Sequence, residues 1–351
     1  MKIVVLGASG NVGTSLLEAL EGSATVDSIV GIARRLPLAR FERTEWRRAD
    51  ISRDDLVHHF EGAGAVVHLA WVIQPSRDEK ALYATNVLGT SRVLDAVARA
   101  KVPALIYASS VGAYSRGPKD RRVDESWPVG GTPTSFYGRH KAACEQLLNR
   151  FEHDHPEVRV VRLRPGLTFK AQAASGIRRL FLGPLVPTSL LRPRLIPVLP
   201  LTPRLRFQAV HSLDVGRAYR AAVENDVHGA FNIAAEPALG PEELGRLLRA
   251  EVVQIPEWPL RAAAAASWRL RLQPTPEGWV DMALNVPLMD TSRARTELGW
   301  EPQVGADSAL LELLEAMRKG EGLDTPPLEP GGVGILRSGE LRTGVGKRAD
   351  R

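Results

Sequence analysis

The stretch "VLGASGNVGTSLL" (Val5–Leu17) continues an apolar run and leads into sequence that favours a helix. Its glycines, Gly7, Gly10 and Gly13, are spaced three residues apart between the predicted strand and the predicted helix. Glycines at such a turn let the backbone approach a pyrophosphate, which then lies at the positive end of the helix. The stretch therefore predicts the first strand–turn–helix unit of a dinucleotide-binding sheet.

The N-terminal half of the chain repeats this unit. Apolar runs such as "SIVGIA", "AVVHLAW" and "PALIYASS" alternate with helix-like segments, which indicates a parallel sheet covered on both faces. We therefore predict an α/β fold with a Rossmann-type doubly wound parallel sheet, mainly in residues 1–165. Residues 166–319 are predicted to form mainly a smaller C-terminal substrate-binding region, with some segments returning to the core. Residues 320–351, rich in Gly, Pro and charge, are predicted to be a flexible tail.

Composition argues against several classes of protein. The 351 residues include one cysteine, Cys144, so an internal disulfide and a cysteine-based zinc cluster are excluded, and we predict no metal site. The first strand-like run begins at Lys2, which leaves no room for a signal peptide, so we expect a cytoplasmic protein. The net charge is +6, but the arginines form no single basic helix, which argues against a nucleic-acid partner.

The segment 177–205 is apolar and also rich in proline and arginine. Proline and charge argue against a transmembrane helix, so we expect no transmembrane segment. The segment is expected to be a loop-rich wall over a ligand pocket or, as an alternative, to touch a membrane surface.

Tyr137 and Lys141 lie four residues apart in "SFYGRHKAACEQ", which reads as a helix. Positions i and i+4 of a helix face the same way, so the ammonium can lie near the phenol. A nearby ammonium stabilises phenolate and lowers the tyrosine pKa, which is about 10 in water. Upstream, the strand in "LIYASSVGAYS" ends at Ser109 and Ser110. This arrangement predicts proton transfer by Tyr137.

These elements resemble the extended branch of the short-chain dehydrogenase/reductase superfamily, the NAD-dependent epimerase/dehydratase family. The resemblance rests on "GASGNVG", on the tyrosine–lysine pair, on "RLRPG" at 162–166 and on "DTSRARTELGWEP" at 290–302. It implies hydride transfer at a carbinol or carbonyl carbon, with catalytic Ser110, Tyr137 and Lys141. Ser110 would orient the substrate oxygen, and Lys141 would also hold the nicotinamide ribose. The positions that it implies for cofactor binding are Gly7, Ser9, Gly10, Asn11, Val12, Gly13, Asp50, Ile51, Leu69, Ala70, Trp71, Asn86, Ser109, Tyr137, Lys141, Pro165 and Gly166.

The choice between the two nicotinamide cofactors depends on the end of the second strand. In "IVGIARRLP" the place of the usual ribose-binding carboxylate is taken by Ala33, followed by Arg34. Arginine can bind a 2′-phosphate that a carboxylate would repel, so we predict Arg34 as a cofactor residue and favour NADP slightly over NAD.

The substrate is less constrained by the sequence. The apolar segment 177–205 favours a small apolar substrate, whereas Arg178 could meet the diphosphate of a nucleotide sugar. Trp71, Ser110, Arg178 and His211 are candidate substrate residues. The main reading is an NAD(P)-dependent oxidoreductase; the alternatives are a nucleotide-sugar epimerase with retained NAD and a non-catalytic NAD(P)-binding regulatory protein. A homodimer is expected from the resemblance alone.

Overall fold

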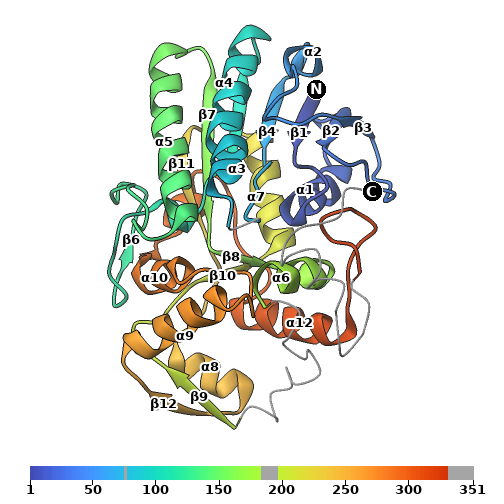
Figure 1. Cartoon of the computed structure of the whole chain (residues 1–351). Coiled ribbons are helices and arrows are strands. Elements are labelled where there is room, and N and C mark those ends of the chain that lie inside the picture. The colour runs from blue at the N-terminus through green and yellow to red at the C-terminus, as the bar shows by residue number, and fades with distance from the viewer. Residues whose placement is uncertain (75–76, 183–196, 331–351) are drawn as a thin grey trace.

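The structure of the protein is a computed structural model that describes residues 1–74, 77–182 and 197–330 (Figure 1). Its centre is a seven-stranded parallel sheet in the order β11-β7-β5-β4-β1-β2-β3. The strands are β1 (Lys2–Leu6), β2 (Ser28–Ala33), β3 (Thr44–Arg48), β4 (Ala65–His68), β5 (Ala104–Ala108), β7 (Arg159–Pro165) and β11 (Gly229–Ile233). The order reverses direction at β1, so the predicted doubly wound sheet is confirmed.

Two apolar cores lie on opposite faces of this sheet. Along β1, Ile3 and Val5 belong to one core, and Val4 and Leu6 belong to the other, as the two-residue period of a strand requires. The first core takes in α1 (Asn11–Glu21), α7 (Ser212–Glu224) and α12 (Ala306–Lys319). The second takes in α2 (Val57–Phe60), α4 (Gly89–Arg99) and α5 (Phe136–Asp154). Burial on both faces explains why β1, β2, β4 and β5 are mainly apolar without alternation.

The C-terminal part of the chain forms smaller units below this sheet (Figure 1). Three two-stranded parallel sheets pair β8 with β10, β9 with β12 and β6 with β13. The strands are β6 (Arg122–Val123), β8 (Leu167–Phe169), β9 (Val198–Leu201), β10 (Ala209–His211), β12 (Glu251–Gln254) and β13 (Leu288–Met289). The remaining helices are α3 (Glu79–Tyr83), α6 (Ala174–Phe181), α8 (Pro241–Leu248), α9 (Glu257–Arg269), α10 (Gly278–Asn285) and α11 (Ser292–Thr296). Short single turns are a π-helical turn (Ala84–Leu88) and two 3₁₀ turns (Val111–Ala113 and Ala171–Ala173).

The start of the predicted tail differs from the prediction. Residues 320–330 are attached to the body: Thr325 and Leu328 are buried, and Arg179 on α6 donates to the backbone oxygens of Pro327 and Glu329. The backbone oxygen of Asp324 also accepts hydrogen bonds from the loop after β2. One buried apolar side chain, together with hydrogen bonds to the backbone, attaches a segment whose average composition suggests disorder. The rest of the predicted tail, 331–351, lies outside the described residues.

Part of the segment 177–205 also lies outside the described residues, at 183–196. Within the described ranges, none of the helices has the length and apolar character needed to cross a membrane.

Candidate active site

The glycine turn joins β1 to α1 through unusually close backbone contacts. Gly7 has φ +78°, and a Cβ there would lie 2.7 Å from the Ala70 nitrogen; a Cβ on Gly13 would lie 2.5 Å from the Gly7 oxygen. Around Gly10, by contrast, a Cβ would meet only the Gly7 oxygen, at 3.3 Å, within 4 Å among the described residues. Close backbone packing thus explains why Gly7 and Gly13 lack a side chain, whereas the backbone around Gly10 is open.

The start of α1 fits an anion. None of the described side chains caps this helix, and its first turn carries no acidic residue. The first backbone N–H groups of a helix lack intrahelical partners and form its positive end. The residues at this turn therefore fit the pyrophosphate of a dinucleotide on structural grounds as well as by spacing.

The predicted adenosine side lies at the ends of β2 and β3. Arg34 is exposed directly after β2, and Asp50 follows β3. Burial by itself would raise the pKa of Asp50, but hydrogen bonds from Ser52 and the charges of Arg34 and Arg53 hold it below its usual value. Ile51, next to Asp50, is buried against Gly89 at the start of α4. The guanidinium group of Arg34 is thus close enough to the Asp50 carboxylate to lower its pKa.

Asn86 fixes the loop that follows β4. Its side chain is fully buried, accepts a hydrogen bond from the Val72 nitrogen (2.9 Å) and donates one to the Val72 oxygen (2.8 Å). Leu69 continues the β4 ladder by donating to the Leu6 oxygen. The segment from Leu69 to Val72 is therefore held at both ends, and Trp71 lies between them.

The C-terminal end of β5 and the start of α5 bring together Ser110, Tyr137 and Lys141. Ser135 caps α5 by accepting from the Gly138 nitrogen, which places Tyr137 in the first turn. Ser110 is buried after β5 and accepts from the Gly112 nitrogen (3.0 Å), and its hydroxyl lies close enough to that of Tyr137 to affect the tyrosine pKa. Lys141 is 3% exposed, and its ammonium donates to the Ala108 oxygen at 2.6 Å.

The electrostatics of this group differ from the expectation. Burial raises the pKa of Tyr137, and the hydrogen bond with Ser110 acts in the opposite direction. Burial also lowers the pKa of Lys141 to about 7, against the charges of Cys144 and Glu145. The ammonium lies 3.5 Å from the centre of the Trp71 ring and 5.8 Å from that of Tyr137. The predicted lowering of the tyrosine pKa by Lys141 is therefore not seen, because the ammonium contacts the indole and a backbone oxygen instead.

Aromatic side chains from distant segments surround Tyr137. Trp279, at the start of α10, lies 5.0 Å from the Tyr137 ring, and Trp71 lies 5.7 Å from it. Phe181, at the end of α6, meets Trp279 edge-on at 5.0 Å. Sequence reasoning predicted Trp71, and Phe181 lies in the segment 177–205 that was expected over a ligand pocket. It missed Trp279, which no motif marks because it approaches Tyr137 only through the fold.

Two other predicted residues lie on β10 and α6. His211 ends β10, accepts from the Leu213 nitrogen and thereby caps α7, and its other ring nitrogen lies 3.2 Å from Glu312 of α12. Arg178 is 5% exposed on α6, and its Nη2 lacks a hydrogen-bond partner among the described residues. His211 thus serves as the N-terminal cap of α7.

A buried ionic network lies directly behind the catalytic candidates. Glu145, one turn after Lys141 on α5, is 2% exposed and accepts two hydrogen bonds from Arg164 (2.8 and 3.0 Å) and one from Arg162 (3.0 Å). It also accepts one from the Ser109 hydroxyl at 2.5 Å. The network therefore joins the helix of Lys141, the strand β7 and the serine next to Ser110.

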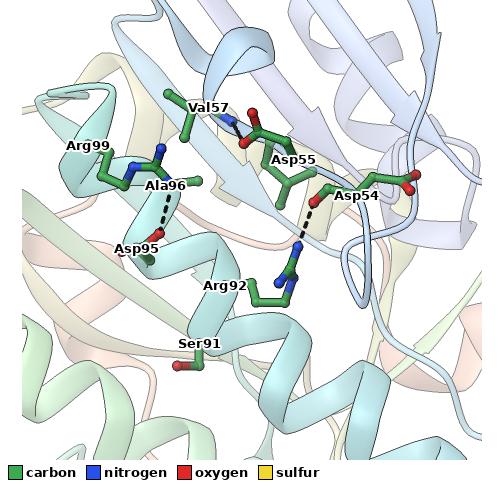
Figure 2. A pocket seen from close by; sticks show the side chains of 9 residues that line it. Asp54, Asp55, Val57, Ser91, Arg92, Asp95, Ala96 and Arg99 are labelled. Carbon is green, nitrogen blue, oxygen red and sulfur yellow. Dashed lines mark hydrogen bonds and ion pairs between the residues drawn. The ribbon is translucent and has the colours of Figure 1, made fainter.

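Figure 2 shows a surface hollow between α2 and α4. It is polar: Arg92 donates to the Asp54 oxygen, and Arg99 pairs with Asp95. Its lining includes none of the predicted site residues. In the described part of the chain, no three or more His, Cys, Asp or Glu side chains are grouped to hold a metal ion.

Comparison with known proteins agrees with this arrangement. Residues 3–234 match the NAD dependent epimerase/dehydratase family. The chain belongs to this family. It is therefore a member of a family of NAD-dependent enzymes of the extended short-chain dehydrogenase/reductase type, as predicted.

Relatives of this family member differ in their substrates. The NAD-dependent glucose-6-phosphate dehydrogenase of Haloferax volcanii is 32% identical over 47% of this chain and 67% of its own length. The next three relatives are matched over only 52 to 61% of their lengths. The 4-hydroxy-2-methyl-3-oxo-4-farnesyl-3,4-dihydroquinoline-1-oxide ketoreductase of Stigmatella aurantiaca is 25% identical over 92% of this chain and 98% of its own.

Among solved structures, the UDP-glucuronic acid 4-epimerase of Bacillus cereus, in complex with UDP-glucuronic acid and NAD, has the same fold. It is 20% identical, with a TM-score of 0.67 over 91% of this chain and 99% of its own. At this identity the likeness supports the fold of the family member and leaves its substrate open.

Proposed function

We propose that this protein is an NAD(P)-dependent oxidoreductase that interconverts a carbonyl and a secondary alcohol on an apolar substrate. The observation that carries the proposal is Tyr137, whose hydroxyl lies near buried Ser110 and whose ring packs against those of Trp71 and Trp279. A proton donor in an apolar enclosure suits a substrate that is itself mostly apolar.

The chain's own residues account for the proton in this reaction. The nicotinamide group, when bound, supplies or accepts the hydride. Tyr137 donates its hydroxyl proton to the carbonyl oxygen during reduction and takes it back during oxidation. Ser110 holds the same oxygen by a hydrogen bond. Lys141, whose ammonium is covered by the indole of Trp71, is the residue that would bind the ribose hydroxyls.

The ketoreductase from Stigmatella aurantiaca supports an apolar substrate, since its name describes a farnesylated dihydroquinoline oxide and its match spans nearly the whole chain. A nucleotide-sugar epimerase is the second candidate. It is favoured by the UDP-glucose 4-epimerase of Erwinia amylovora among the relatives, and by buried Arg178, which could meet a diphosphate.

One experiment separates these two functions. The freshly purified protein is denatured and any released nucleotide is identified, and the native protein is then assayed with NADPH or NADH on apolar ketones and with UDP-sugars. We expect little retained nucleotide and net oxidation of the reduced cofactor with an apolar ketone. Stoichiometric retained NAD, with sugar epimerisation and no net cofactor turnover, would replace the oxidoreductase by the epimerase.

Trp279 provides a test of substrate class. Replacing Trp279 with alanine should raise KM for an apolar ketone and lower kcat/KM by about 10- to 100-fold, because a central aromatic contact is lost. Trp258→Ala is the matched control, because Trp258 is 71% exposed on α9. Steady-state kinetics of both variants show whether the substrate contacts Trp279. Equal kinetics for the two variants would show that the substrate does not contact Trp279.

Arg34 provides a test of cofactor choice. We propose that NADP is preferred, since an exposed arginine stands where a ribose-binding carboxylate is usual. Arg34→Ala should weaken NADPH binding by roughly tenfold or more, the loss of one charge-assisted hydrogen bond, and leave NADH binding unchanged. Arg40→Ala, at another exposed arginine of the same loop, is the control. If calorimetry finds that NADH binds the wild type more tightly than NADPH, the preference is NAD.

We also propose a homodimer through the helices that follow β4 and β5, as the family resemblance suggests. Tyr83 and Leu88, which precede α4, are exposed hydrophobic residues that such an interface would cover. Light scattering on the purified protein distinguishes a dimer from a monomer.

A further inference from the structure

Lys170 is a buried lysine behind the glycine turn that the proposed reaction does not use. It follows β8 and is 1% exposed. Its ammonium donates to two hydroxyls in α1, Thr14 Oγ1 at 2.7 Å and Ser15 Oγ at 2.9 Å. Two segments separated by about 150 residues therefore meet at this ammonium.

The charge of Lys170 is only partly compensated. Thr14 and Ser15 are neutral acceptors. The nearest carboxylate is that of Glu18 on α1, 4.0 Å away and 39% exposed. On α12, Glu312 acts on the ammonium from farther away and is shared with His211 and the Ala171 nitrogen. Burial lowers the pKa of Lys170 to about 8, and the charges of Glu18 and Glu312 act in the opposite direction.

The position of this ammonium is unfavourable without an anion. It lies against the first turns of α1, where the helix already presents its positive end. Thr14 Oγ1, which Lys170 contacts, in turn donates to the Gly10 oxygen at 3.0 Å, so two hydrogen bonds separate the ammonium from the open glycine of the turn. A buried cation and a helix N-terminus thus act on the same small region from two sides.

We propose that Lys170 is a positioning residue for the cofactor pyrophosphate, to which it supplies positive charge from behind the glycine turn while it holds the first turn of α1 through Thr14 and Ser15. This inference rests on the proposed function, which places a dinucleotide at that turn. Lys170 acts across the turn rather than by direct contact, and its bonds to α1 fix the N–H groups that face the phosphates.

Dinucleotide binding at the glycine turn is expected to depend on pH. An anion at the turn stabilises the ammonium form, so binding raises the pKa of Lys170 above its value of about 8 in the free protein. Near pH 8 to 9 binding then takes up protons, and affinity falls as the pH rises through this range. His211 also lies near this group, through its contact with Glu312. Lys141 lies on the ribose side, and a ligand without the nicotinamide riboside removes its contribution.

The test uses ADP, which carries the pyrophosphate but lacks that riboside, together with NADH and NADPH. Calorimetric titrations of the full chain between pH 7.5 and 9.5, in buffers of different ionisation enthalpy, measure affinity and proton uptake. The wild type should take up protons and lose affinity as the pH rises. Lys170→Met should bind all three ligands roughly tenfold more weakly at pH 7.5, and the pH dependence of ADP binding should be removed. Lys119→Met is the matched control, because Lys119 is also buried and donates to two backbone oxygens, those of Arg206 and Ala283, away from the turn.

Each outcome decides the proposal. Unchanged affinity in Lys170→Met, with a lower melting temperature, would show that Lys170 only joins β8 to α1 and would overturn it. Absence of proton uptake by the wild type would overturn it without any variant, so the test stands even if Lys170→Met fails to fold. If the wild type binds none of the three ligands, the proposed function itself fails, and that result is distinct from equal binding by wild type and variant.

Discussion

Replacing Tyr137 with phenylalanine is expected to lower kcat by about 10²- to 10⁴-fold, the usual contribution of a positioned general acid–base group. The substitution removes only the hydroxyl that meets Ser110, and it keeps the ring between Trp71 and Trp279. Packing and dinucleotide binding should therefore stay nearly unchanged. Stopped-flow single turnovers and calorimetric binding of NADH and NADPH measure the two properties separately.

The matched control is Tyr83→Phe, which removes a hydroxyl from a tyrosine that is 44% exposed on α3. It should keep wild-type turnover. If Tyr137→Phe retains more than about a tenth of wild-type kcat, Tyr137 is not the proton donor. The site would then operate through another group. A wild type without any turnover would instead indicate a non-catalytic dinucleotide-binding protein.

Replacing Glu145 with alanine is expected to lower the free energy of unfolding by about 3–5 kcal/mol, the cost of leaving a buried charge without its partner. Two guanidinium groups, those of Arg162 and Arg164, and the Ser109 hydroxyl would lose their common acceptor. Arg164 would keep its bonds to the Tyr114 hydroxyl and the Glu125 oxygen, but these carry no full negative charge. Denaturant unfolding of wild type and variant gives the difference directly.

Glu152→Ala is the control on the same helix. Glu152 also pairs with Arg162, but it is 33% exposed, so its loss should cost only about 1 kcal/mol or less. A loss below about 1 kcal/mol for Glu145→Ala would contradict the interpretation of the network.

Burial would raise the pKa of Glu145, but Arg164 and Arg162 hold it below its usual value. Its contribution to stability is therefore present above the ordinary glutamate pKa and is lost as the pH falls through the lower folded value.

Local sequence patterns predicted the elements that lie within a single strand–turn–helix unit. The spacing of Gly7, Gly10 and Gly13 predicted the turn after β1, and Tyr137 and Lys141 were placed on one helix by their four-residue spacing. Such patterns reflect steric limits and periodicities that act over a few residues. The alternation of such units also predicted the doubly wound parallel sheet, because short connections restrict the topologies that a chain can adopt.

Composition was a poorer guide at the C-terminal end. Residues 320–330 were predicted to be flexible because glycine, proline and charge dominate there. In the structure Leu328 is buried, and the backbone of this segment pairs with α6 and with the loop after β2. Average composition misses one well-placed apolar side chain, because burial depends on where the rest of the fold leaves room.

By itself, the sequence determined the doubly wound sheet, the glycine turn and the group formed by Ser110, Tyr137 and Lys141. Only the tertiary structure decided what surrounds them: Trp279 beside Tyr137, Glu145 between two arginines, and Lys170 behind the turn. The physical reason is distance along the chain. Backbone sterics and helical periodicity act within one element, whereas these neighbours come from separate elements that meet only after the sheet and its helices have packed.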